Sequence, residues 1–272
     1  MTLARSAAAP ALAPYWEFAK KAFAREATYR FEVFTDAGAL VLRVYLLRCL
    51  WTALYAQNAA PLNLPLHAMI TYATLAMLMS LVLEVDGTRL IRERLREGTI
   101  ATDLMKPISL PFYFFADGFG RTMLYGVLVI PMLLCSLLLV HLDVPPPATL
   151  GMFVLSFLIA YALNFVLNFC MNAIAFWTLE TFALQLIVRW ISDLLSGQII
   201  PLTLFPGFAG TLLFALPFAA IYSTPLLLYV GVIAPSGWRD ALAFQIAWLV
   251  VFSLLAALIW RAASRRIVIQ GG

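Results

Sequence analysis

Charged residues are scarce in this sequence: aspartate, glutamate, lysine and arginine together make up 12% of the 272 residues. Hydrophobic residues reach 63%, whereas soluble domains contain roughly 45–50%. This shortage of charge excludes an ordinary soluble domain and indicates an integral membrane protein. The net charge of +4 says little by itself, because the side of the membrane on which lysine and arginine lie matters more.

Cysteine and histidine are also rare. Cys49, Cys135 and Cys170 lie far apart in apolar stretches and match no ligand spacing, so we interpret them as packing residues and expect no disulfide. His67 and His141 lack a surrounding cluster of ligating residues, which argues against a metal site. The sequence contains no His-Glu-x-x-His, no Gly-x-Ser-x-Gly and no carboxylates clustered deep in an apolar run. These absences argue against an intramembrane enzyme.

Long apolar runs, in contrast, are abundant. A bilayer core about 30 Å thick requires about 20 apolar residues per helix. Six segments satisfy this requirement: 40–60, 66–84, 114–141, 150–177, 183–204 and 241–260. We therefore predict an all-α membrane protein with six transmembrane helices in a single domain, 1–272. Residues 1–38 carry basic residues before any long apolar run, so we expect the first span to act as the insertion signal.

Two further segments are predicted to meet the membrane without crossing it. Residues 208–234 are apolar but are interrupted by Gly210, Pro217, Pro225 and Gly231, which predicts two half-helices that enter the membrane and return. Residues 15–34 mix aromatic and basic side chains, the pattern of an amphipathic helix on the membrane surface. The alternative for 15–34 is a cytoplasmic helix packed on the rest of the protein.

The distribution of basic residues predicts the orientation. With six crossings, 13 basic residues fall on one side and only Arg239 falls on the other. The 13 are Arg5, Lys20, Lys21, Arg25, Arg30, Arg89, Arg92, Arg94, Arg96, Lys106, Arg261, Arg265 and Arg266. The positive-inside rule then places both termini and the 85–111 loop in the cytoplasm.

The 85–111 loop contains the densest charge in the chain. Thr88–Glu97 is predicted to form a short helix that Gly98 ends. Thr99 is placed to cap a second short helix that ends at Lys106, because the next residue is proline. A solvated, positive-inside loop would explain the arginines alone. It would not explain the apolar residues Ile100, Leu104 and Met105, or the acidic residues among the basic ones.

The chain resembles a known family at this point. It combines a surface helix, two spans, a basic segment reading "EGTIATDLMKPISLP", three spans, a broken segment "LPFAAIYSTPLLLYVG" and a last span. This order is similar to the six-span permease subunits of type-2 ATP-binding-cassette (ABC) exporters, in particular the bacterial group often encoded as two permeases beside one ATPase. The residues that carry the resemblance are Glu97, Gly98, Asp103, Lys106, Pro107, Pro217 and Pro225.

The resemblance implies a division of labour. A separate cytoplasmic ATPase dimer would bind ATP and Mg, and the 85–111 loop would carry the coupling helix that docks on it. This chain has no Gly-x-x-x-x-Gly-Lys-Ser/Thr motif, so it is expected to bind no cofactor itself. The expected coupling residues are Arg92, Arg94, Leu95, Arg96, Glu97, Gly98, Ile100, Asp103, Leu104, Met105 and Lys106. The implied location is the bacterial cytoplasmic (inner) membrane, and the further partners are a second identical or homologous permease and membrane lipids, with no nucleic acid.

Polar residues inside spans 4 and 5 mark a candidate translocation path. Asn164, Asn168 and Asn172 recur every four residues and share one helix face. In span 5, a second shared face carries Gln185, Arg189 and Asp193. Intramembrane charges usually face the bundle interior or a wet cavity. The alternative is that both faces only join helices to each other.

Other polar residues have simpler interpretations. Asp117 and Arg121 are spaced as an i,i+4 ion pair. Arg48 lies deep in span 1 and requires a partner, for which Glu84 and Asp36 are both candidates.

Two other functions compete with the permease hypothesis. An ion-driven transporter would normally show broken helices at two corresponding places with acidic residues at mid-membrane depth, whereas this sequence has one broken segment. A non-transporting scaffold would use the surface helix and charged loop only for docking. The substrate and the identity of the second permease remain open from sequence.

Overall fold

The computed structural model describes residues 12–28, 30–56, 64–83, 85, 87–140, 142–178 and 182–270, and all regular structure within these ranges is helical. The long helices are α2 (Arg30–Ala56), α3 (Leu66–Leu83), α6 (Leu110–Val140), α7 (Pro147–Ala173) and α12 (Trp238–Gln270). The shorter helices are α1 (Leu12–Glu26), α4 (Arg89–Arg96), α5 (Ile100–Leu104), α8 (Ala175–Thr178), α9 (Phe182–Leu195), α10 (Gly207–Ala215) and α11 (Ser223–Tyr229). Short 3₁₀ turns are η1 (Leu202–Leu204), η2 (Pro217–Ala220) and η3 (Pro235–Gly237). The predicted all-α fold is confirmed for the described residues.

Five helices in the described part of the chain are long and apolar enough to cross a membrane. They are Gly38–Ala56, Leu66–Leu83, Leu110–Leu138, Pro147–Thr178 and Pro235–Arg265. Each overlaps one predicted span, although the ends differ. Residues 57–63, Glu84 and His141, at the ends of three predicted spans, lie outside the described residues, as does the side chain of Asp36.

The predicted span over 183–204 is not one continuous helix. Helix α9 has 14 residues, fewer than the about 20 that a crossing requires. A turn follows in which Gly197 has a φ of +82°, a left-handed conformation that glycine adopts readily. The Tyr72 hydroxyl donates to the Gly197 carbonyl oxygen at 2.7 Å and fixes this turn in the core. The sixth crossing therefore stays a prediction, and residues 179–181 before α9 lie outside the described residues.

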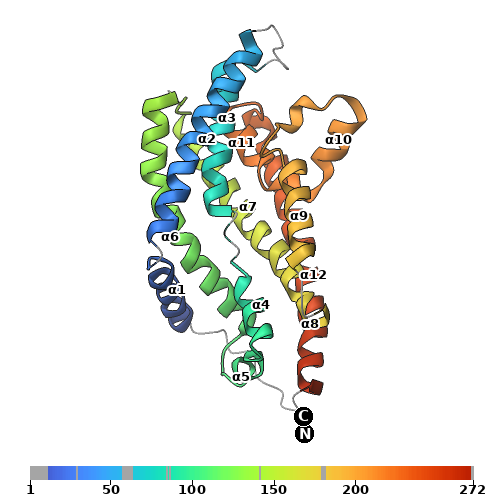
Figure 1. Ribbon diagram of the computed structural model, residues 1–272. Coiled ribbons are helices and arrows are strands. Elements are labelled where there is room, and N and C mark those ends of the chain that lie inside the picture. Colours follow the sequence, from blue (N-terminus) through green and yellow to red (C-terminus); the bar gives the residue numbers. More distant parts are fainter. Residues whose placement is uncertain are drawn as a thin grey trace.

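The two ends of the molecule carry different segments (Figure 1). Helices α4 and α5 lie at one end, which the last turns of α12 also reach, and α10 and α11 lie near the opposite end. The segment predicted at 208–234 is indeed broken into short pieces, α10, η2 and α11. The charged loop and the broken segment thus occupy opposite ends, as the predicted topology requires.

Helix α3 lies at the centre of the bundle. In α3, 78% of the stretch that could cross a membrane is buried inside the protein, whereas in each of the other four candidate spans the buried share is 22% or less. Tyr72, at its middle, is 1% exposed and packs in a cluster with Leu163 of α7 and Leu226 of α11. Helix α3 ends at Leu83 and α4 begins at Arg89, so the charged segment follows directly on the most buried of the candidate spans.

Helix α1 packs along the beginning of α6. Its small residues Ala19 and Ala22 are buried, and the Ser109 amide donates to the Tyr15 hydroxyl at 2.9 Å. This packing is what the alternative interpretation of 15–34 expected, and a turn at residues 27–28 separates α1 from α2. Trp16 is exposed, and contact of α1 with lipid stays a prediction.

Gly120 allows the backbones of α1 and α6 to approach closely. A Cβ at this position would lie 2.1 Å from the Ala19 carbonyl oxygen. We expect Gly120→Ala to lower the free energy of unfolding by about 1–3 kcal/mol, the usual cost of overpacking, which exceeds the roughly 0.5–1 kcal/mol that alanine gains in a helix. Urea titration in detergent micelles measures this change. The control is Gly126→Ala, where a Cβ would meet nothing within 4 Å; equal losses in both variants would contradict the expectation.

Candidate functional site

The charged stretch before α6 folds as two short helices. Helix α4 occupies Arg89–Arg96 and α5 occupies Ile100–Leu104, close to the predicted 88–97 and 99–106. Gly98 separates them with a φ of +70°, the conformation in which glycine commonly ends a helix. Thr99, predicted to cap α5, makes no side-chain capping bond.

The apolar side of this segment faces the rest of the chain. Leu90 and Ile91 of α4 and Ile100 of α5 are each 6% exposed or less. They belong to one hydrophobic cluster with Phe114 of α6. Ile100 is therefore a core residue, contrary to the prediction that it contacts a partner, because α5 turns it toward α6.

Other residues of the segment remain available to a partner. Met105 is 75% exposed, the most exposed large apolar side chain of the segment. Arg96 and Glu97 are exposed as well, whereas Leu95 is partly buried. The side chain of Leu104 lies outside the described residues. The exposed surface therefore combines one flexible apolar side chain with charges of both signs.

Asp103 joins the two short helices from within. Its side chain is 3% exposed, and Lys106 Nζ donates to it at 2.5 Å. Arg94 Nε lies 3.3 Å from Asp103 Oδ2, an ion pair without hydrogen-bond geometry. Partial burial opposes the charge of Arg94, but a hydrogen bond with Tyr113 and the Asp103 carboxylate outweigh it and raise the pKa of Arg94. Through these two contacts, the buried Asp103 carboxylate stabilises the packing of α5 against α4.

The predicted asparagine ladder connects three neighbouring segments. Asn164 Nδ2 donates to the carbonyl oxygen of Leu83, the last residue of α3, at 2.6 Å. Asn172 donates to the hydroxyl of Thr88, directly before α4, and accepts a hydrogen bond from Gln185 of α9. Asn168 bonds within its own helix, to the Asn164 carbonyl oxygen at 2.9 Å. The ladder therefore holds α7 against α3, α9 and the start of the charged segment.

A polar cavity of about 440 Å³ lies beside this ladder. Five of the six predicted path residues line it: Asn164, Asn168, Gln185, Arg189 and Asp193. The sixth, Asn172, does not line the cavity but bonds to Gln185, which does. Arg89 and Arg92 of α4 also line the cavity. Sequence reasoning assigned Arg92 to partner docking, because its distance in sequence from spans 4 and 5 gave no sign of this contact.

The charged segment and the polar cavity thus share residues, Arg89 and Arg92. A family model described as ABC-2 family transporter protein matches residues 40–271, which include the charged segment and every residue that lines the cavity. The chain belongs to the ABC-2 transporter family. The predicted resemblance to type-2 ABC permeases is thereby confirmed. Comparison with curated proteins and with solved structures finds no match.

Family membership supplies a general role. An ABC-2 permease is the membrane component of an ABC transporter, carries no ATPase site of its own and generally works with an ATPase partner. The five membrane-length helices of the described residues agree with such a component.

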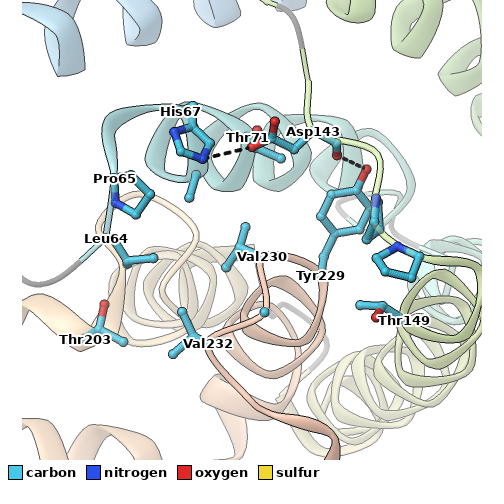
Figure 2. A pocket seen from close by; sticks show the side chains of 14 residues that line it. Leu64, Pro65, His67, Thr71, Asp143, Thr149, Thr203, Tyr229, Val230 and Val232 are labelled. Carbon is cyan, nitrogen blue, oxygen red and sulfur yellow. Dashed lines mark hydrogen bonds and ion pairs between the residues drawn. The ribbon is translucent and has the colours of Figure 1, made fainter.

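This ABC-2 permease has a second cavity, of about 650 Å³, at the end that contains α11 (Figure 2). His67 Nε2 lies 3.4 Å from Asp143 Oδ2 across it. The Tyr229 hydroxyl donates to the Asp143 backbone oxygen at 2.9 Å. These contacts join α3, the segment before α7 and α11. No group of three or more potential metal ligands occurs among the described residues.

Proposed function

We propose that this ABC-2 permease exports a substrate across the bacterial cytoplasmic membrane, driven by ATP hydrolysis on a separate ATPase dimer. Six crossings with both termini in the cytoplasm place α4 and α5 where that ATPase docks. The observation that carries the proposal is that α4 lies at the surface and at the polar cavity at once, since Arg89 and Arg92 line the cavity. A push on α4 therefore reaches the candidate path directly.

The remaining assembly follows from the same arrangement. Two permease copies, identical or homologous, would stand above two ATPase subunits. Helix α9 offers a mainly exposed apolar side with Ile187 and Trp190, where a second permease or lipid would cover it. At the outer end, α10 and α11 would act as the lid, and the hydrogen bond from the Tyr229 hydroxyl of α11 to the Asp143 backbone oxygen would hold it closed.

The driving force required is modest. Alternating access needs two states that differ by a few kcal/mol, which differential binding of a partner can bias. Closure of the ATPase dimer would move α4 and α5 as a unit, because Asp103 joins Arg94 of α4 to Lys106 after α5. The Asn172 bond to Thr88 would carry that movement to α7.

The docking surface is tested with the exposed residues of the segment. We expect Met105→Asp and Glu97→Arg each to weaken binding of the partner ATPase by about tenfold or more, since loss of a central contact commonly costs more than about 1 kcal/mol. Titration of the purified permease with that ATPase measures the affinity. The control is Arg239→Glu, at the beginning of α12, whose last turns and not its first reach the end of the molecule with α4 and α5 (Figure 1). Unchanged affinity in both segment variants, or an equal loss in the control, would disprove docking at α4 and α5.

A further inference from the structure

An apolar groove of about 490 Å³ runs along α7, with α6 on one side and α12 on the other. Five of its lining residues are aromatic: Phe112, Phe115, Phe165, Phe169 and Trp260. Apart from Ser253 and Arg261, every described residue that lines it is apolar or aromatic. The groove opens at the surface of the protein, because Phe112 is 56% exposed and Ala257 is exposed as well.

The groove exists because α12 carries small side chains at one place. Ser253, Ala256 and Ala257 are three and four residues apart and therefore share one helix face. Around them α12 exposes long apolar side chains, among them Leu254 and Leu258. The small residues leave room between α12 and α6 that the protein itself does not fill.

The floor and walls of the groove are held in place by ring contacts. Phe165 of α7 meets Phe115 of α6 edge-on, with ring centroids 4.9 Å apart. Phe169 is 5% exposed, and its ring centroid lies 6.0 Å from that of Trp260. A groove that is apolar along its length and fixed in shape is suited to a hydrocarbon chain.

One end of the groove reaches the edge of the apolar segments. The candidate span of α6 begins at Leu110, directly before the lining residue Pro111, and that of α12 ends at Arg265. This is the end of the molecule that α4 and α5 occupy (Figure 1). Arg261 lies eight residues after Ser253, about 12 Å along the helix. Arg261 is therefore placed where hydrocarbon gives way to water, and the rest of the groove lies deeper.

Arg261 gives this end of the groove a polar contact. Its side chain is exposed and makes no ion pair with a residue that the structure describes. The planar guanidinium of arginine is well suited to phosphate, to which it donates two parallel hydrogen bonds. A phospholipid carries its phosphate next to its acyl chains. Its chain and its phosphate thus match the apolar groove and the guanidinium at the groove's end.

A helix of another protein fits the same groove less well. An apolar helix laid over it would bury the Arg261 guanidinium without an opposite charge, which is strongly unfavourable. A second copy of this chain, in a two-fold contact centred on the groove, would bring its own Arg261 to the same place, because such a contact joins identical surfaces. A phospholipid supplies the opposite charge instead.

We propose that this groove binds a membrane phospholipid, with one acyl chain along α7 between α6 and α12 and its phosphate on Arg261. Phe169 on the floor belongs to the same hydrophobic cluster as Leu90 and Ile91 of α4. The bound chain would therefore support the packing beneath the charged segment. The proposal depends neither on the direction of transport nor on the ATPase partner.

Binding is measured with the full-length permease in a neutral detergent, by native mass spectrometry. The probes are dioleoylphosphatidylglycerol, dioleoylglycerol, which has the same chains without the phosphate, and glycerol 3-phosphate, which has the phosphate without the chains. We expect the phospholipid to bind, and the other two to bind at least about tenfold more weakly. Arg261→Gln should weaken binding of the phospholipid by about tenfold, the scale of one charge-assisted hydrogen bond. Arg261→Lys keeps the charge and should retain most of the affinity.

A matched pair of variants on α12 tests the groove itself. Ala257→Trp fills the groove from an exposed position, and it should weaken binding of the phospholipid by about tenfold or more. Leu258→Trp adds the same ring at the next residue, which is 62% exposed and does not line the groove, and it should leave binding unchanged. Both variants should melt close to wild type without lipid, because substitutions at exposed positions usually change stability little. If Ala257→Trp melts clearly lower, the comparison of Arg261→Gln with Arg261→Lys decides.

The assignment is overturned if dioleoylglycerol or glycerol 3-phosphate binds as tightly as the phospholipid, if Arg261→Gln binds it as wild type does, or if Leu258→Trp loses as much affinity as Ala257→Trp. If Ala257→Trp keeps the lipid but converts a permease dimer into monomers, the groove is a contact between copies and the proposal is wrong. Failure of the permease to bind an ATPase would refute only the proposed function, because the lipid titration uses the permease alone.

Discussion

Replacement of Asp117 by alanine is expected to lower the free energy of unfolding by about 3–5 kcal/mol, the usual cost of leaving a buried charge without its partner. The Asp117 side chain is 4% exposed and accepts from Arg121 Nε at 3.1 Å. Arg121 is itself only 8% exposed. Without the Asp117 carboxylate, the Arg121 guanidinium would remain buried at the start of α6 and would lose this ion-pair partner.

Asp117 also joins α1 to α6. Arg25 of α1 donates to both carboxylate oxygens, at 2.9 and 3.1 Å. The Arg25 side chain is 48% exposed, and solvent-exposed pairs contribute about 1 kcal/mol at most. Arg25→Ala should therefore destabilise the protein far less than Asp117→Ala does.

Unfolding by urea in detergent micelles, followed by tryptophan fluorescence, measures both changes. The double variant Asp117→Leu with Arg121→Met is the decisive control, because replacing a whole buried ion pair by apolar residues is often nearly neutral. We expect it to recover most of the stability lost in Asp117→Ala. A loss below about 1 kcal/mol in Asp117→Ala, or no recovery in the double variant, would show that the buried pair contributes little.

The Asp117 cluster also shows how far the sequence could predict the structure. The four-residue spacing was enough to predict the pair of Asp117 with Arg121, because helix geometry alone brings such residues together. Arg25 lies 92 residues from Asp117, and no local pattern indicates that contact. Hydropathy likewise predicted the five long spans, because the length and apolar composition of a segment are enough to show that it could cross a membrane.

Errors arose where tertiary contacts decide the local form. The end of α9 depends on Gly197, where a Cβ would lie 2.2 Å from the Ser223 hydroxyl oxygen. An apolar run gives no sign of that enclosure, so 183–204 was predicted as one helix. Ile100 shows the same limit on a smaller scale, because a short amphipathic helix does not reveal whether its apolar face meets α6 or another protein.

The asparagine ladder was predicted from its spacing, but its partners could not be. Recurrence every four residues showed that the three amides share a face. It did not show that Asn172 meets Thr88 and Gln185, which lie 84 and 13 residues away. These two contacts distinguish a ladder that only joins helices from one that connects the charged segment to the polar cavity.

Replacement of Asn172 by leucine is therefore expected to disconnect ATP hydrolysis from transport. Asn172 is 1% exposed, and the change removes the partner of Thr88 and the acceptor for Gln185. Each buried polar group that loses its bond costs about 1–3 kcal/mol. The expected result is normal binding of the ATPase, continued ATP hydrolysis and at least about tenfold slower transport, a change of about 1.4 kcal/mol in the barrier.

A double-mutant cycle with Thr88→Val tests the specific contact. If the Asn172 to Thr88 bond transmits the movement of α4, the two substitutions should not be additive, and the double variant should transport no more slowly than Asn172→Leu alone. Ser156→Ala is the matched control in the same helix, because it removes a buried polar contact of α7, from Ser156 Oγ to Gln245 Oε1 at 2.9 Å, at a residue that does not line the polar cavity; it should leave the ratio of transport to ATP hydrolysis closer to wild type. Additive losses in the cycle would mean that α4 acts on the cavity by another route, for which Arg89 and Arg92 are the residues that already line it.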